Sequence, residues 1–290
     1  MTPFASLVLG LSTLAGGEAL AQDLPARNLP AGDATPHAEM ALAGLGSPVT
    51  LERSAQFDVA GPAGVLRVLV SAPTAPPPPS GYGVIYAIDA GWTFGTLRDT
   101  LRLQGGDAPR GPTVVVALGW PVPDLIDLPR RGPDLVGSNA AATLALLTDT
   151  IVPRIEAALP VDPAHRMILG HSFGGAFALR AGLTHPELFS HIAAGSPSIW
   201  TDPDWFLRTP PPQAGAPKVL VTLGALEFPE AAAAAGTPPE RVDRLRARDM
   251  AGRAEAMATR LGTQAEIVDG ASHGSSVPAF LARAAGFLWR

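Results

Sequence analysis

The sequence predicts an α/β fold, in which a mostly parallel sheet is covered by helices on both faces. From residue 82 onward, short and continuously apolar segments alternate with amphipathic segments of helical length. Strands that are apolar along their whole length are typical of parallel sheets, because crossover helices bury both faces. Before residue 82, two alternating segments flank a Gly-Pro-Ala-Gly turn, which predicts an antiparallel hairpin at one sheet edge.

The elements are expected in the following order along the chain. Predicted strands cover residues 49–59, 65–70, 84–88, 113–118, 167–169, 192–195, 218–223 and 265–268. Predicted helices cover residues 94–103, 139–159 with a bend at Pro153, 174–183, 241–261 and 277–289. Residues 121–137, which follow the predicted strand 113–118, are rich in Pro and Gly and are expected to form an irregular excursion.

Composition indicates one large domain and excludes several classes of function. The chain has 290 residues, of which 47% are hydrophobic and 16% charged, and its net charge is −5. That balance gives no reason to expect a nucleic-acid partner. The absence of cysteine excludes disulfides, thiolate metal sites and a cysteine nucleophile. No His, Asp or Glu cluster has metal-ligand spacing, so no metal site is expected.

The N-terminal segment has the features of a secretory signal. An apolar run at residues 4–14 is followed by Ala19-Leu-Ala21, the small-x-small pattern of a cleavage site. We expect residues 1–21 to be a signal peptide, 22–47 a Pro/Gly-rich arm and 48–290 the α/β domain of a periplasmic or secreted protein. Because the first residues include no Lys or Arg, an N-terminal extension of a cytosolic protein is the alternative. No other stretch predicts a membrane span.

The most informative stretch is RMILGHSFGG at residues 166–175. Its G-x-S-x-G match lies between a short apolar strand and an amphipathic helix, which is the context of a nucleophile elbow. Gly170 and Gly174 remove the Cβ atoms that would collide where strand and helix approach. We therefore predict Ser172 as a nucleophile; a structural Gly-Ser turn is the alternative.

A serine nucleophile needs a base, and the base needs an orienting acid. His273 lies in a loop between the last predicted strand and the last predicted helix, at the strand ends where such sheets carry their sites. The other histidines lie in the arm, beside the nucleophile or at the opposite strand ends: His37, His165, His171, His185 and His191. We predict His273 as the base, with a backbone-paired loop histidine as the alternative.

Enzymes with this elbow carry the acid between the serine and the histidine in chain order. Glu227 follows the predicted strand 218–223 and meets that condition. The competing acids come too early, face solvent on a predicted helix, or shape a turn: Asp202, Asp204, Asp243, Asp249 and Asp269. We predict Glu227 as the acid; the alternative is a dyad whose histidine is held by water or a carbonyl.

The oxyanion that forms during acyl transfer needs two backbone N–H donors. We predict the N–H of Phe173, at the start of the elbow helix, and that of Gly91, in the loop after strand 84–88. Arg130 and Arg131 are predicted to hold an anionic substrate group, with a solvated basic pair as the alternative. Aromatic walls are predicted at Trp92 and Trp200, where packing is the alternative.

These residues also resemble a known family. From about residue 50 to 290, the chain is similar to the putative-esterase family of α/β-hydrolases, the group of enterobactin-type siderophore esterases. The similarity is carried by residues 161–180, by HPELF at 185–189 with AGSPSIW at 194–200, and by LGALE at 223–227. Residues 88–92, IDAGW, resemble the family's Leu-Asp-Gly-Asn oxyanion loop, with Ala90 in place of the usual glycine.

The resemblance implies an α/β-hydrolase fold and serine ester hydrolysis through an acyl-enzyme, without a cofactor. It points to a small-molecule ester, of siderophore type or with another bulky acyl group, in a family that includes S-formylglutathione hydrolases and mycolyl transferases. Two alternatives stay open at this point: an acyltransferase on the same triad, and a non-catalytic binding protein on a hydrolase scaffold. The sequence does not give the oligomeric state.

Overall fold

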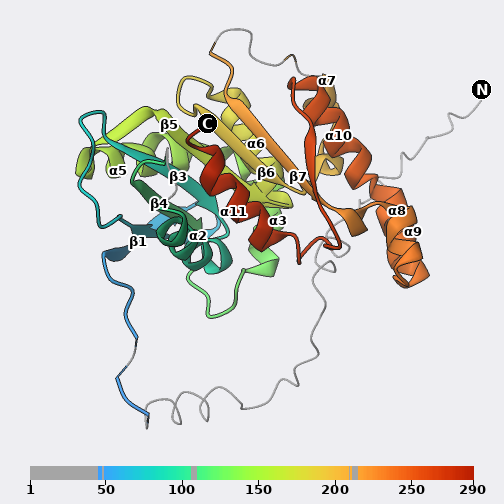
Figure 1. Ribbon diagram of the computed structural model, residues 1–290, viewed down its shortest axis with the longest axis horizontal. Coiled ribbons are helices and arrows are strands. Elements are labelled where there is room, and N and C mark those ends of the chain that lie inside the picture. Colours follow the sequence, from blue (N-terminus) through green and yellow to red (C-terminus); the bar gives the residue numbers. More distant parts are fainter. Residues whose placement is uncertain (1–44, 48, 106–109, 209, 211–214) are drawn as a thin grey trace, which may run out of the picture.

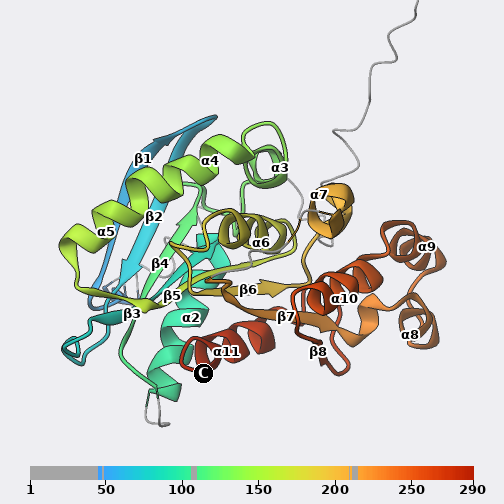
Figure 2. The ribbon, with the colours of Figure 1, turned by 90° about the horizontal axis from the view of Figure 1, so that it is seen from above.

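The structure is a computed structural model that describes residues 45–47, 49–105, 110–208, 210 and 215–290. The expected signal peptide at residues 1–21 and nearly all of the expected arm at 22–47 lie outside the described residues. Within the described part, the chain forms one central sheet with helices on both of its faces (Figures 1 and 2).

Eight strands form the sheet, in the order β1-β2-β4-β3-β5-β6-β7-β8. The first two form the expected edge hairpin, and β2 also pairs antiparallel with β4. The remaining neighbours are parallel. The bounds are β1 Ser54–Gly61, β2 Gly64–Ser71, β3 Tyr82–Ile88, β4 Thr113–Gly119, β5 Val161–His171, β6 His191–Gly195, β7 Lys218–Gly224 and β8 Ala265–Val268.

The helices form two layers and an end group (Figure 2). One face carries α2 (Ala90–Gln104) and α11 (Val277–Phe287), and the other carries α3 (Leu128–Val136), α4 (Ala140–Leu146), α5 (Val152–Ala158) and α6 (Phe173–Thr184). The β8 end carries α8 (Pro229–Ala234), α9 (Pro239–Arg248) and α10 (Met250–Arg260). Shorter elements are η2 (Leu147–Ile151), η3 (Ile199–Thr201), α7 (Pro203–Arg208) and η4 (Ala225–Glu227).

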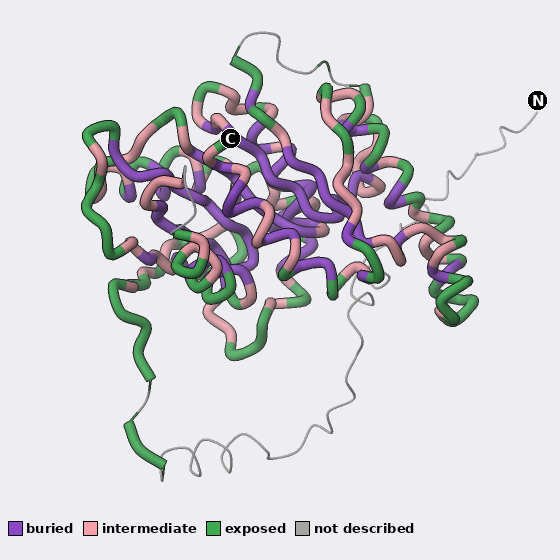
Figure 3. The backbone as a smooth tube through the Cα atoms, in the orientation of Figure 1, coloured by how far each residue is buried: buried purple, intermediate pink, exposed green. Residues whose placement is uncertain are grey.

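Burial along β3 explains why its sequence is continuously apolar. All seven of its residues are buried, and successive side chains enter different cores. Val84 and Tyr86 pack on the α6 side, whereas Ile85 and Ala87 pack on the side of α2 and α11. In Figure 3, the buried residues accordingly lie in the middle of the molecule. Full burial of one such aliphatic side chain contributes about 1.5–3 kcal/mol.

The helices differ in detail from the expected pattern at three places. The excursion at 121–137 contains α3, whose N-terminus is capped by the Asp127 carboxylate, which accepts a hydrogen bond of 3.1 Å from the backbone N–H of Arg130. The helix expected at 139–159 contains a π-helical turn, η2, which ends two residues before Pro153. Proline has no N–H, so Pro153 cannot donate the usual helical hydrogen bond to the carbonyl of Asp149. Asp149 lies within the π-helical turn.

The third difference is a break in the helix expected at 241–261. Asp249 adopts a left-handed conformation with φ 46° and ψ 47°, and it ends α9 and begins α10. Aspartate visits this region more readily than most residues because its short polar side chain can bond locally. The uninterrupted helical pattern of the sequence contained no glycine or proline at this position to signal the break.

No single helix in the described ranges has both the length and the apolar character needed to cross a membrane. One strongly bent pair, α3 together with the segment Ala140–Ala158, passes on length and composition alone.

Candidate active site

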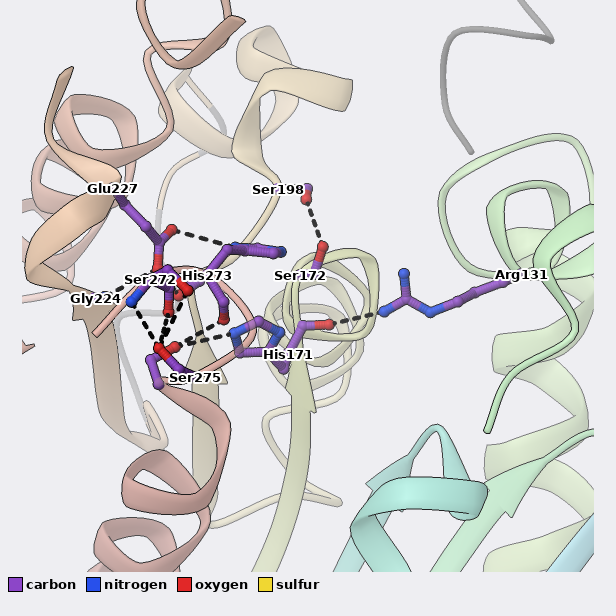
Figure 4. A network of polar contacts seen from close by, with 11 residues as sticks. Arg131, His171, Ser172, Ser198, Gly224, Glu227, Ser272, His273 and Ser275 are labelled. Atoms are coloured by element: carbon purple, nitrogen blue, oxygen red, sulfur yellow. Dashed lines mark hydrogen bonds and ion pairs between the residues drawn. The ribbon is translucent and has the colours of Figure 1, made fainter. Parts of the chain in front are cut away.

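The candidate site lies at the carboxyl edge of the parallel strands, where three loops meet (Figure 4). The loop from β5 to α6 carries Ser172, η4 after β7 carries Glu227, and the loop from β8 to α11 carries His273. These residues come from strands that are not all neighbours, yet parallel strands bring their carboxyl ends to one edge. The structure therefore brings together the three residues that the sequence predicts as a triad.

The backbone at Ser172 is strained, as a nucleophile elbow requires. Its φ of 59° and ψ of −120° lie outside the regions that non-glycine residues prefer; such conformations cost about 1–3 kcal/mol and are found at functional sites. A Cβ on Gly170 would lie 2.1 Å from the carbonyl oxygen of Gly174, so this crossing of strand and helix demands glycine. Hydrogen bonds hold the serine on both sides: its N–H donates to Gly195 at 2.9 Å, and its carbonyl accepts from Ser198 at 3.0 Å.

Glu227 is buried and held by three donors. The carboxylate is 1% exposed, and its Oε2 lies 3.3 Å from Nδ1 of His273. Its other oxygen, Oε1, accepts from the backbone N–H of Gly224 at 2.9 Å and from the hydroxyl of Ser196 at 2.5 Å. A carboxylate held in this way fixes both the orientation and the tautomer of the imidazole that it contacts.

The His273 ring extends from Glu227 toward Ser172 (Figure 4). Among the described contacts, the Ser172 hydroxyl has one side-chain partner, the hydroxyl of Ser198 at 3.3 Å, and it makes no hydrogen bond to His273. In unliganded enzymes the bond between nucleophile and base is often long and shortens when substrate binds. The arrangement is that of a serine-type site in its free state.

Two helix N-termini meet at the predicted oxyanion site. Phe173 is the first residue of α6, and Gly91 is the second residue of α2. Strands β3 and β5 are parallel neighbours, with Ala87 opposite Leu169, so both helices begin at the same edge. First-turn N–H groups have no partner within their helix, and the helix dipole favours negative charge there. A Cβ on Gly91 would lie 2.3 Å from the carbonyl oxygen of Leu125, so the approach of the 120–127 loop requires glycine there.

The prediction that Arg131 binds substrate was wrong. Its guanidinium is buried and donates to both carboxylate oxygens of Asp89 at 2.8 Å and to the carbonyl of His171 at 3.1 Å. Arg131 therefore ties the loop after β3 to the elbow strand. The sequence could place Arg131 in the excursion near the site. It could not show that the guanidinium binds a buried carboxylate 42 residues earlier in the chain.

The structure also places Arg130 in internal contacts. It donates to the carbonyls of Val65 at 2.9 Å and Gly64 at 3.3 Å, and it lies 3.3 Å from the carboxylate of Asp134. These contacts connect α3 to the edge hairpin. They lend no support to a substrate contact, so that role of Arg130 stays a prediction.

The two predicted tryptophans lie on different sides of the elbow, and both are half-buried. Trp92 packs edge-on against His171, with ring centroids 5.6 Å apart. Trp200 lies 5.9 Å from Phe173, and the guanidinium of Arg248 lies 4.6 Å from its ring centroid. Both rings therefore have packing roles, while a contact with substrate remains a prediction for each.

His171 is a neutral packing partner of His273, the predicted base. Burial lowers the pKa of His171 well below its usual 6.5, and the nearby His273 and Arg131 lower it further. The ring centroids of His171 and His273 are 4.6 Å apart. A neutral ring at this position supports the His273 loop without placing a second positive charge beside it.

Sequence reasoning missed two serines in the Gly195-Ser-Pro-Ser198 segment. Ser196 donates to Glu227, and its own backbone has a φ of 40°. Ser198 contacts Ser172 through both its N–H and its hydroxyl. The available signal was the position of this segment directly after an apolar strand that neighbours the elbow strand.

The fold and the site geometry define a serine-type α/β-hydrolase. The family model for the putative esterases matches residues 64–221. The chain belongs to the putative esterase family and is an ester hydrolase.

Individual relatives agree with this assignment. The chain is 28% identical to the ferri-bacillibactin esterase BesA of Bacillus subtilis, over 76% of this chain and 83% of that protein. It is 33% identical to a siderophore enterobactin esterase of Emericella nidulans, in a match that covers 40% of this chain and 46% of that protein. The solved siderophore hydrolase EstB from Aspergillus nidulans superimposes with a TM-score of 0.70 at 24% identity, covering 84% of this chain and 97% of that one, which shows a common fold.

Proposed function

We propose that this chain hydrolyses siderophore-type esters through an acyl-enzyme on Ser172, His273 and Glu227. The observation that carries the proposal is the His273–Glu227 contact at 3.3 Å beside a strained serine elbow. The names of the relatives, which are esterases of bacillibactin and enterobactin, supply the substrate class.

The proposed reaction has two steps. His273 takes the proton of the Ser172 hydroxyl as its oxygen attacks the ester carbonyl, and the N–H groups of Phe173 and Gly91 hold the oxyanion. The carbon–oxygen bond to the alcohol then breaks, and the alcohol leaves with the proton from His273. Water, activated by the same histidine, attacks the acyl-enzyme and releases the acid. Glu227 holds the imidazole throughout.

The test compares Ser172→Ala with Ser138→Ala, an exposed serine that serves as a matched control. We expect Ser172→Ala to lower kcat/KM for p-nitrophenyl esters by roughly 10⁴-fold or more, while the control keeps wild-type rates. A panel of siderophore trilactones beside short acyl esters then measures the substrate preference. Unchanged turnover by Ser172→Ala would exclude this serine as the nucleophile.

No observation in the described site favours acyl transfer over hydrolysis. Product analysis with an added alcohol or sugar acceptor separates the two reactions. We expect the free acid to dominate; a majority of transferred acyl groups would instead assign the chain as a transferase.

We also propose a periplasmic or secreted location. The support is the apolar run at residues 4–14 followed by Ala19-Leu-Ala21. Mass spectrometry of the protein from its native host should find a mature N-terminus at Gln22. An intact N-terminus in the cytosolic fraction would contradict the proposal.

A further inference from the structure

Beside the His273–Glu227 pair lies a small pocket with an unusual concentration of positive charge. The pocket, of about 120 Å³, is bounded on one side by Glu227 and His273 and on the other by helix α9. Three arginines of α9 face it: Arg241, Arg244 and Arg248. They share one side of the helix because their spacing of three and four residues matches the helical repeat.

Two of the three arginines, Arg241 and Arg244, have no carboxylate partner among the described residues. Arg246, on another side of α9, instead lies 3.2 Å from the carboxylate of Asp243. Glu227 also lines the pocket, but its oxygens already accept from Gly224, Ser196 and His273. The protein as a whole carries a net charge of −5, so this local positive charge runs against the overall balance.

Helix stability does not account for Arg241 and Arg244. Arg241 is the third residue of α9, and Arg244 lies in its middle. Positive side chains are favourable in the last turn of a helix, where they face the negative end of the dipole, and unfavourable in the first. Arg246 and Arg248 occupy the favourable last turn. Arg241 is therefore unfavourable for the stability of α9 at this position. Such a cost is expected when a residue binds a ligand.

The third arginine connects this pocket to the elbow. Its guanidinium lies 4.6 Å from the ring centroid of Trp200, whose ring in turn lies 5.9 Å from Phe173. Burial lowers the pKa of Arg248 from its usual value. Contacts therefore run from Arg248 through Trp200 to Phe173, at the start of α6, where the oxyanion is expected.

We infer that the α9 arginines form a subsite for a polyanionic part of the substrate, and that the enzyme prefers the iron-loaded, trianionic catecholate form of a siderophore ester to the iron-free form. The choice of a siderophore rests on the proposed function, whereas the anion subsite rests on α9 alone. Guanidinium groups suit this role because they bind anionic oxygens in charge-assisted, often paired hydrogen bonds.

The first experiment measures hydrolysis of one catecholate trilactone, with and without Fe(III), by wild type and by Arg241→Gln/Arg244→Gln. We expect the double variant to raise KM for the ferric form roughly tenfold, with kcat and the hydrolysis of a neutral p-nitrophenyl ester unchanged. Arg246→Gln is the matched control, since it removes an arginine from the same helix outside the pocket. An unchanged ratio of ferric to iron-free kcat/KM in the double variant would overturn the inference.

The second experiment separates the subsite from the proposed function. A hexadentate tris-catecholamide without ester bonds, loaded with Fe(III), is tested as a competitive inhibitor of neutral ester hydrolysis. We expect inhibition of the wild type and a roughly tenfold higher inhibition constant for the double variant. If no siderophore ester is hydrolysed but this shift is found, the substrate proposal fails and the subsite stands. If siderophore esters are hydrolysed and the inhibition constant does not change, the subsite is wrong and the function stands.

Discussion

At the scale of single residues, the site depends on how Glu227 is held. A buried carboxylate is costly unless hydrogen bonds compensate for its lost hydration. Gly224, Ser196 and His273 supply those bonds here. Of these, only the Ser196 hydroxyl can be removed without changing the backbone or the proposed base.

Ser196→Ala should therefore lower kcat while leaving KM close to the wild-type value. Hydrogen bonds to charged groups contribute about 1.5–3 kcal/mol, so the expected loss in kcat is about 10- to 100-fold. Steady-state kinetics on a neutral ester measure it, with Ser138→Ala as the exposed control. Wild-type kcat in Ser196→Ala would mean that two donors suffice to hold Glu227.

The Arg131–Asp89 pair is the second feature that belongs to this scale. Arg131→Met leaves the buried Asp89 carboxylate without its bidentate partner, and loss of one member of a buried pair costs about 3–5 kcal/mol. We expect that loss in the free energy of unfolding, measured by urea denaturation.

Two comparisons make this prediction specific. Arg208→Met removes one member of an exposed pair with Asp204 and should change stability by less than about 1 kcal/mol. Adding Asp89→Asn to Arg131→Met should recover part of the loss, because it removes the uncompensated charge. A double variant less stable than Arg131→Met alone would contradict this account.

At the scale of elements, the break between α9 and α10 decides where the arginines of α9 point. A continuous helix would extend the axis of α10, which packs Ala251, Ala254 and Ala258 against β7. The left-handed residue Asp249 instead allows α9 to leave that axis and to lie beside α8 at the end of the molecule (Figures 1 and 2).

Substitutions at Asp249 should follow the cost of the left-handed conformation. A β-branched Asp249→Val should lower the free energy of unfolding by about 1–2 kcal/mol, because its Cβ substituents clash with the backbone there. Asp249→Asn and Asp249→Gly should be tolerated, since both residues adopt positive φ at low cost. Thermal unfolding of the three variants gives the order; equal stability of Val and Asn would show that the break does not depend on this residue.

At the scale of the whole molecule, buried histidines make stability depend on pH. Burial lowers the pKa of His171 well below 6.5, and burial together with Lys218 and His165 lowers that of His191 to about 4. Well above pH 6.5 these side chains are neutral in both the folded and the unfolded chain. As the pH falls below 6.5, the unfolded chain takes up protons that the folded chain refuses, so the folded state loses stability.

Urea unfolding at pH 8 and pH 5 should show this loss, at about 1–2 kcal/mol for each histidine. His191→Gln should reduce the difference in the free energy of unfolding between pH 8 and pH 5 by about 1–2 kcal/mol. His185→Gln, which replaces a histidine whose side chain is 34% exposed, is the control and should leave the difference unchanged. A pH dependence that is identical in wild type and His191→Gln would exclude this histidine as a source.

Much of the architecture could be predicted because it is encoded locally. Continuous apolar runs specify buried parallel strands, and the Gly-Pro-Ala-Gly turn specifies the edge hairpin. The prediction failed where a local signal was absent or misleading. Asp249 breaks a helix without glycine or proline, and α3 forms in spite of Gly132 and Pro133 because Asp127 caps it and Leu135 is buried.

The sequence by itself determined the fold class, the elbow at Ser172 and the chain positions of His273 and Glu227, since each follows from a short pattern and its place after a strand. Only the tertiary structure decided what surrounds them. Arg131 turned inward to Asp89, Ser196 became a donor to Glu227, and the α9 arginines came to line the pocket of His273. These contacts join segments far apart in the chain, so they depend on how the elements pack and leave no local pattern in the sequence.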